Sequence, residues 1–75
     1  MNAASVLDMR MRTAELSLVI ARRRRAALSL LPHPTTRTEV VAQLRTFAEI
    51  QDQERRATAE RARAVRARYL PELVA

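Results

Sequence analysis

The sequence contains no cysteine, glycine, lysine or tryptophan, and each absence narrows what the chain can be. Without cysteine, the chain can form neither disulfide bonds nor thiolate metal sites. Without glycine, it lacks the residue that most often forms left-handed turns, helix C-caps and phosphate-binding loops. One Phe and one Tyr are the only aromatic residues, so there is no aromatic platform on which nucleic-acid bases could stack. These absences favour a fold of long helices with few tight turns.

Long apolar runs are also absent from the sequence. No stretch approaches the roughly 18 consecutive residues that a membrane-spanning helix needs. The N-terminal region lacks the basic-then-apolar order of a secretory signal, because Asp8 and Glu15 interrupt it. We therefore expect a cytoplasmic protein.

Charge and composition describe a small basic domain. The 75 residues include 14 basic and 8 acidic side chains, which gives a formal net charge of +6, and every basic one is arginine. A guanidinium group binds phosphate or carboxylate through two parallel hydrogen bonds, so both kinds of partner fit. A core of Ala, Leu and Val with almost no aromatic rings makes thin, close contacts between helices. We expect residues 1–75 to form one helical domain that is marginal alone and that self-associates or docks onto a larger body.

One break divides the chain into two helical segments. The sequence Pro32-His33-Pro34 stops a helix, because residues that precede proline are disfavoured in the α region. Thr36 and Glu39 then fit a capping box at the start of the next helix. We predict an all-α, antiparallel two-helix hairpin with helices at about 5–31 and 37–70 and an interhelical turn at 32–36. The alternative is one bent rod without internal contacts.

The outer ends of these helices carry weaker signals. Ser5 and Asp8 have the spacing of a related N-terminal capping motif, and Asn2 is a competing N-cap. Pro71 is expected to end the second helix near Tyr69 or Leu70.

The first predicted helix has two apolar stripes, whereas a single hairpin partner covers only one. The first stripe consists of Leu7, Met11, Ala14, Leu18, Ala21 and Leu28. The second stripe consists of Val6, Met9, Leu16, Ile20, Ala27 and Leu31. An uncovered apolar stripe favours association, so we expect the hairpin to pack into a helical bundle or larger assembly.

The second predicted helix shows a single seam with the spacing of a coiled coil. The seam consists of Val41, Leu44, Ala48, Gln51, Arg55, Thr58, Ala62, Val65 and Tyr69. From both helices, the candidate packing or interface residues are Leu7, Met11, Leu16, Leu18, Ile20, Leu28, Val41, Leu44, Phe47, Val65 and Tyr69.

Charge is segregated along the second helix. Residues 39–54 carry a net charge of −3, and residues 55–68 carry +5. If the antiparallel hairpin is centred on Pro34, Asp8 reaches Arg61 and Glu49 reaches the arginines near residue 24.

No set of residues indicates catalysis. His33 is the only histidine and has no neighbouring base, acid or second ligand type. No Glu-x-x-His motif is present, and no serine or threonine has an adjacent base. We therefore expect no enzymatic activity, no cofactor, no metal and no small-molecule substrate.

The most informative motif is the arginine run, which consists of Arg22, Arg23, Arg24 and Arg25. Four consecutive residues sweep through roughly 300° of a helix, so at least one arginine points at whatever packs against it. The run suits nucleic-acid phosphates, carboxylates of neighbouring subunits, an anionic membrane surface, or simple solvation. The sequence has no residues arranged to recognise nucleic-acid bases. The acidic residues within the helices argue against binding to an anionic membrane surface.

The sequence therefore favours a non-enzymatic accessory or assembly subunit whose partners are other proteins or further copies of itself. A virus-like particle or another multi-protein machine would be such a complex. The alternative is a nucleic-acid-binding hairpin acting as a four-helix dimer, an architecture that resembles small RNA-binding helical hairpins in outline. Its candidate phosphate or partner contacts are Arg22, Arg23, Arg24, Arg25, Arg55, Arg56, Arg61, Arg63, Arg66 and Arg68.

Overall fold

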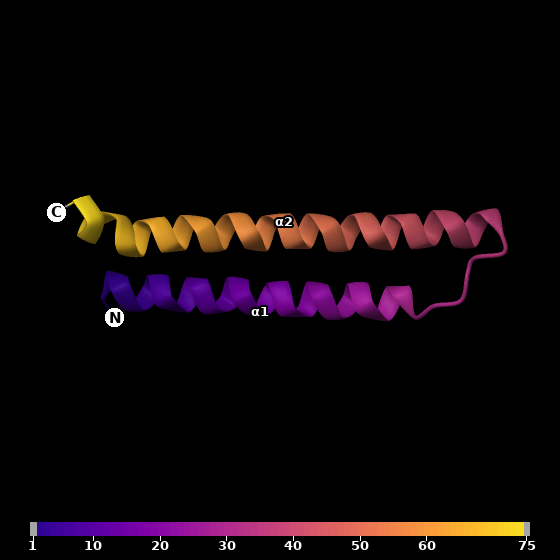
Figure 1. The fold of residues 1–75 in the computed structure, drawn as a ribbon, viewed down its shortest axis with the longest axis horizontal. Helices are drawn as coiled ribbons and strands as arrows, with labels where there is room; N and C mark the ends of the chain where they lie inside the picture. The colour runs from indigo at the N-terminus through magenta and orange to yellow at the C-terminus, as the bar shows by residue number, and fades with distance from the viewer. Residues whose placement is uncertain (1, 75) are drawn as a thin grey trace.

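A computed structural model describes residues 2–74 as two helices packed side by side, with no strand in that range. Helix α1 spans Ala3–Ser29 and helix α2 spans Arg37–Val74. The helices run antiparallel, so both ends of the chain lie at the same end of the molecule (Figure 1). The predicted all-α antiparallel hairpin is confirmed.

Helix α1 begins and ends two residues earlier than predicted. Asn2 is its N-cap, and Asn2 Oδ1 accepts a 2.8 Å hydrogen bond from the Ser5 amide. Ser5 therefore lies inside the first turn rather than at the cap. At the other end Leu30 is the C-cap, because Leu31 precedes a proline and is disfavoured in a continuing helix.

Helix α2 begins at the predicted residue, and its cap is close to the predicted one. Thr36 Oγ1 accepts a 3.2 Å hydrogen bond from the Glu39 amide, as a capping box requires. The carboxylate of Glu39 reaches back to the amide of Thr35, at 2.9 Å, rather than to the amide of Thr36. Both interactions occupy amides that have no partner within the first turn of the helix.

The prediction that Pro71 ends the second helix is wrong. Helix α2 continues through Pro71 to Val74. Proline has no amide hydrogen and its ring crowds the preceding turn, so it bends a helix that continues past it. Figure 1 shows the last turn of α2 set at an angle to the rest of the helix.

The two helices differ in length, and this difference sets their register. With 27 and 38 residues, α1 and α2 are roughly 40 Å and 57 Å long. The first turns of α2 therefore extend past the end of α1 (Figure 1). The connecting segment 30–36 passes these overhanging turns, and Gln43 Nε2 donates a 3.4 Å hydrogen bond to the carbonyl of Pro32.

The predicted pairing of residues across the hairpin is wrong by about one heptad. Arg68 Nε lies 3.6 Å from Asp8 Oδ1, and Arg61 Nε lies 3.2 Å from Glu15 Oε1. Asp8 therefore faces Arg68 rather than Arg61. The cause is the long connection, which carries the chain outward before α2 turns back along α1.

The contact between the helices is narrow and consists mainly of alanine. Its fully buried hydrophobic side chains are Ala14, Ala21, Ile50, Ala57 and Ala64. They recur every seven residues on each helix, which is the repeat of an antiparallel coiled coil. The first stripe of α1 is the one that faces α2, since its other members, Leu7, Met11, Leu18 and Leu28, are half-buried.

The predicted seam of α2 is not the face that packs on α1. Val41, Leu44 and Tyr69 are exposed, whereas Ile50, Ala57 and Ala64 are buried. Both sets keep spacings of three and four residues, so spacing alone does not distinguish them. Val41 and Leu44 belong to the overhanging turns, which α1 does not reach.

Replacing Ile50 should reveal how much stability this contact provides. We expect Ile50→Ala to lower the free energy of unfolding by about 2–4 kcal/mol, because it removes a fully buried side chain and leaves a cavity. Leu44→Ala, at a position that is 62% exposed, should change it by less than about 0.5 kcal/mol. Urea titration of the helical circular dichroism signal measures both. Equal losses would show that Ile50 is not at the centre of the contact.

Candidate interaction surfaces

Two members of the arginine run point toward α2, and the first of them is Arg24. Its Nη1 donates a 2.8 Å hydrogen bond to Gln53 Oε1, and its Nη2 lies 3.9 Å from Glu49 Oε2. The predicted approach of Glu49 to the arginine run is confirmed. The carboxylate that faces Arg24 thus comes from the same chain.

Arg25 makes the second of these contacts. Its Nε lies 3.2 Å from Glu54 Oε1, as an ion pair without the angle of a hydrogen bond. Its guanidinium also lies over the ring of Phe47, 5.4 Å from the ring centre, where a cation–π attraction adds to the ion pair. Arg25 therefore joins two residues that are about two helical turns apart on α2.

The other two arginines of the run, Arg22 and Arg23, are exposed. Neither forms an ion pair with any residue that the structure describes. The run is therefore divided into two arginines that bridge the helices and two that are available to another molecule.

The second basic cluster contributes further bridges near the chain termini. Arg61 Nε donates a 3.2 Å hydrogen bond to Glu15 Oε1. Arg68 lies between two carboxylates, with Nη1 2.7 Å from Glu72 Oε1 and Nε 3.6 Å from Asp8 Oδ1. The hydrogen bond to Glu72 raises the pKa of the Arg68 guanidinium.

The remaining arginines of this cluster face solvent. Arg56 pairs with Asp52 at 2.7 Å along the same helix. Arg55, Arg63 and Arg66 are exposed and form no ion pair within the described residues. Exposed pairs of this kind contribute about 0–1 kcal/mol each. The Arg56–Asp52 pair lies within α2, so it has no effect on the register between the helices.

One of the two apolar stripes is left uncovered, as the sequence predicted, and it is the second, apart from its half-buried Val6. Met9, Leu16, Ile20 and Leu31 are all more than half exposed, and Leu16 is the most exposed of them at 63%. Among the candidates on α2, Val41, Leu44, Phe47 and Tyr69 are exposed and Val65 is half-buried.

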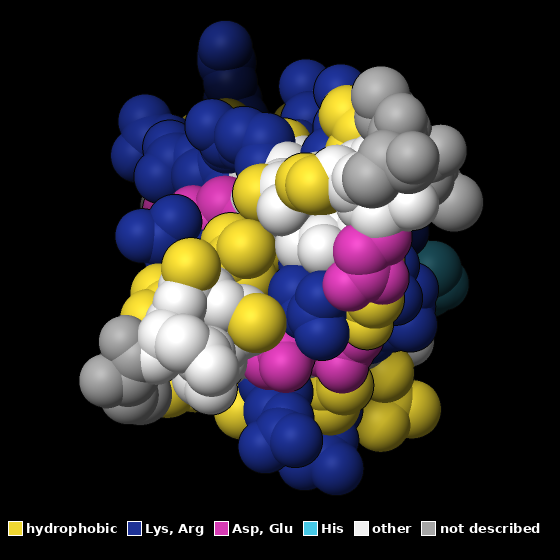
Figure 2. Space-filling model, turned by 90° about the vertical axis from the view of Figure 1, so that its left-hand side faces the viewer, with side chains coloured by type: hydrophobic (Ala, Val, Ile, Leu, Met, Phe, Trp, Pro, Cys, Tyr) yellow, Lys and Arg dark blue, Asp and Glu magenta, His cyan; other side chains and the backbone are white. Residues whose placement is uncertain are grey.

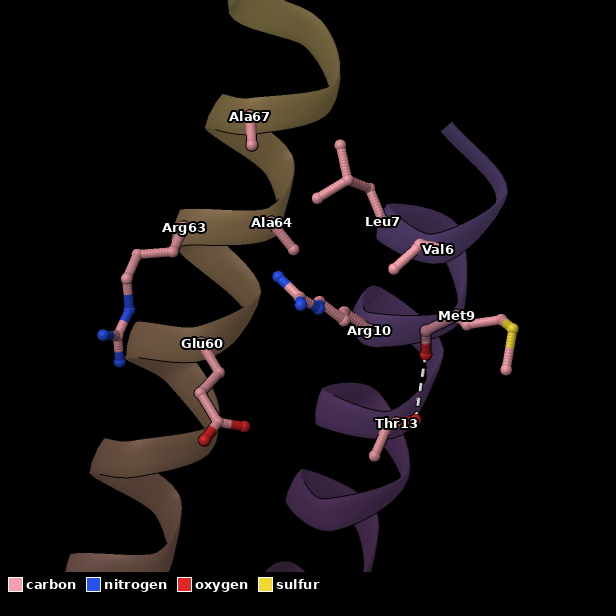
Figure 3. Close-up of a pocket in the computed structure, with 9 residues that line it drawn as sticks. All are labelled: Val6, Leu7, Met9, Arg10, Thr13, Glu60, Arg63, Ala64 and Ala67. Atoms are coloured by element: carbon pink, nitrogen blue, oxygen red, sulfur yellow. Dashed lines mark hydrogen bonds between the residues drawn. The ribbon is translucent and has the colours of Figure 1, made fainter. Parts of the chain in front are cut away.

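A groove lies between α1 and α2 near the chain termini. Its apolar lining consists of Val6, Leu7, Met9, Ala64 and Ala67. Arg10 extends across it from α1, and Glu60 and Arg63 border it on α2 (Figure 3). The view onto this end of the hairpin shows arginine side chains gathered at the upper left, with hydrophobic side chains below them (Figure 2). The groove was not predicted, because residues 6–9 and 64–67 become neighbours only in the observed register.

Other kinds of site find no support in the described residues. Within 2–74, no group of three or more histidine or acidic side chains is placed to hold a metal ion. In the same range, no helix is long and apolar enough to cross a membrane. His33 is exposed on the connecting segment.

Arg25 should contribute to stability, whereas Arg22 should not. We expect Arg25→Gln to lower the free energy of unfolding by about 0.5–1 kcal/mol, through loss of the Glu54 pair and the Phe47 contact. Arg22→Gln removes the same charge from an exposed position and should have almost no effect, since Gln keeps good helix propensity. Urea unfolding at low and high salt measures both variants. Equal effects of the two substitutions would contradict the assignment.

Comparisons with protein-family models, with curated proteins and with solved structures found no match for this chain. Function is therefore inferred from the surfaces of the hairpin itself.

Proposed function

We propose that this chain is a non-enzymatic helical subunit that docks onto, or oligomerises within, a larger protein complex. The observation that carries the proposal is the uncovered second stripe of α1, where Leu16 and Ile20 are 63% and 52% exposed. Soluble monomers rarely leave a continuous apolar stripe in water, and such stripes mark protein contacts.

The exposed area of the hairpin supports this proposal. A compact monomer of 8.5 kDa exposes about 4,700 Å². The hairpin exposes 6236 Å², roughly 1,500 Å² more. A standard protein interface buries about 800 Å² on each partner, so the excess is large enough for one or two such contacts.

The shape of the molecule leads to the same conclusion. The hairpin measures 58 × 18 × 16 Å, and its radius of gyration is 17.2 Å. A compact domain of this length has a radius of gyration of about 11 Å. Ile50 is the one large side chain that is fully buried within the described range. A two-helix rod with so little core is typical of a protein that completes its packing on a partner.

Substitutions in the stripe test this proposal. We expect the purified chain to be larger than a monomer at micromolar concentration, and the double variant Leu16→Glu/Ile20→Glu to be monomeric and still helical, because charge on the stripe opposes its burial. The control Val19→Glu places one negative charge on a neighbouring exposed position outside the stripe. Light scattering during gel filtration gives the masses. A monomeric parent with a cooperative thermal transition would contradict the proposal.

Nucleic-acid binding is the second candidate, and the number of arginines free of ion pairs favours it. Of the 14 arginines, five form ion pairs within the described structure. The other nine are Arg10, Arg12, Arg22, Arg23, Arg37, Arg45, Arg55, Arg63 and Arg66. Neighbours such as Arg10 and Arg12 lie about 200° apart around a helix, so these arginines are spread over several faces.

Arg22 and Arg23 are the members of the run that can test this second candidate. If they bind duplex phosphates, Arg22→Gln/Arg23→Gln should weaken binding and flatten its salt dependence by about 0.9 in log–log slope for each lost contact. The control Arg37→Gln/Arg45→Gln removes two exposed arginines from α2 and should leave the slope unchanged. Fluorescence anisotropy with a random-sequence duplex measures both. Identical behaviour of both variants and the parent would show that Arg22 and Arg23 do not contact phosphates.

A further inference from the structure

The groove near the termini has a shape that can accommodate a third helix. Ala67 is the exposed alanine of its floor on α2, and Ala64, which is buried against α1, lines its inner edge; neither side chain extends beyond Cβ. Val6 flanks this floor from α1, and Ala64 and Leu7 point into the space between the helices, whereas the side chain of Met9 extends away from α2 (Figure 3). Small side chains opposite larger ones allow ridges of another helix to pack closely.

The apolar surface of the groove continues along α2. An adjoining hollow is lined by Arg66, Leu70 and Pro71, and it shares Arg63 and Ala67 with the groove. Together the two hollows follow α2 from Glu60 to Pro71, a distance of roughly 16 Å or three helical turns. This length accommodates apolar side chains from three successive turns of a docked helix.

The charges around this surface are almost all positive. Arg10, Arg63 and Arg66 border it, and none of them forms an ion pair with a described residue. Arg63 Nε donates only to the carbonyl of Ala59 on its own helix. Glu60 is the single acidic residue in the lining, so these side chains carry a net charge of +2.

We propose that this groove binds an acidic amphipathic helix of another protein, with apolar residues on the alanine floor and Asp or Glu side chains beside Arg10, Arg63 and Arg66. This inference rests on the proposed docking function and names the chemistry of the partner. A symmetric pair of chains that face each other through this groove is disfavoured, because it would bring the same three arginines against their equivalents. Nucleic acid would satisfy the arginines but would leave the apolar floor without a partner.

Designed peptides can test the chemistry of the occupant directly. The probe is a fluorescent helical peptide of about 20 residues, roughly 30 Å long, with leucine at coiled-coil spacing and glutamate at the flanking positions. Two matched peptides carry glutamine or lysine at those flanking positions. Anisotropy titrations use the complete 75-residue chain. We expect the glutamate peptide to bind about tenfold more tightly than the glutamine peptide, with the lysine peptide weakest, and the preference to decline with salt.

Variants of the chain then locate the binding site. Arg10→Gln/Arg63→Gln should weaken glutamate-peptide binding about tenfold and leave glutamine-peptide binding nearly unchanged. The control Arg12→Gln/Arg45→Gln removes the same charge from exposed positions that do not line the groove and should change neither affinity by more than about twofold. Ala67→Glu places a carboxylate on the floor and should abolish binding of the glutamate peptide, while the helical circular dichroism signal remains.

Several outcomes would overturn the inference. Equal affinity for the glutamate and glutamine peptides would show that charge does not select the partner. Equal effects of the groove and control variants would place the binding elsewhere. Binding of a DNA duplex that the groove variant weakens, without glutamate-peptide binding, would identify nucleic acid as the ligand. In each case, loss of self-association on Leu16→Glu/Ile20→Glu would still support the docking function, so the two proposals fail separately.

Discussion

The close packing of alanine against alanine between α1 and α2 is the contact on which the rest of the structure depends. Ala14 and Ala21 on one helix and Ala57 and Ala64 on the other allow the backbones to approach closely. At this separation the flanking arginines and carboxylates can reach across the contact. Leu16 and Ile20 lie on another face of α1 and stay outside this contact. The hairpin therefore buries mainly small alanine side chains, while larger apolar side chains remain on its outside.

The ion pairs between the helices specify the register that the alanines leave open. Because alanine repeats every seven residues, a slip of one heptad would preserve much of the apolar contact. A slip in one direction would bring Glu15 opposite Glu54, and a slip in the other would bring Arg25 opposite Arg61. Each places like charges together, whereas the observed register pairs Glu15 with Arg61 and Arg25 with Glu54. The pairs contribute little energy individually, but they discriminate against both neighbouring registers.

Local chemistry explains which parts of the fold were predictable from the sequence. The proline pair at residues 32 and 34 and the cap at Thr36 act within a few residues, so the break and the start of α2 were correct. The register depends on the path of the connection between the helices, which no local sequence pattern encodes. The predicted pairing of Asp8 with Arg61 would also place Glu15 opposite Glu54, and this repulsion was not taken into account. Pro71 was misread because a helix accommodates proline when its last turn bends. The groove, which needs Arg10 and Ala64 as neighbours, depended on that register and was missed for the same reason.

The dimensions of the hairpin, 58 × 18 × 16 Å, also determine how it moves through water. Viscous drag on a rod follows its length more than its mass, so the protein should diffuse like a heavier sphere. A position on a size-exclusion column calibrated with spherical standards will then exceed the true mass of each species. The number of chains in an assembly must come from a mass measurement, and a side-by-side pair of rods will elute closer to the single rod than the doubled mass suggests.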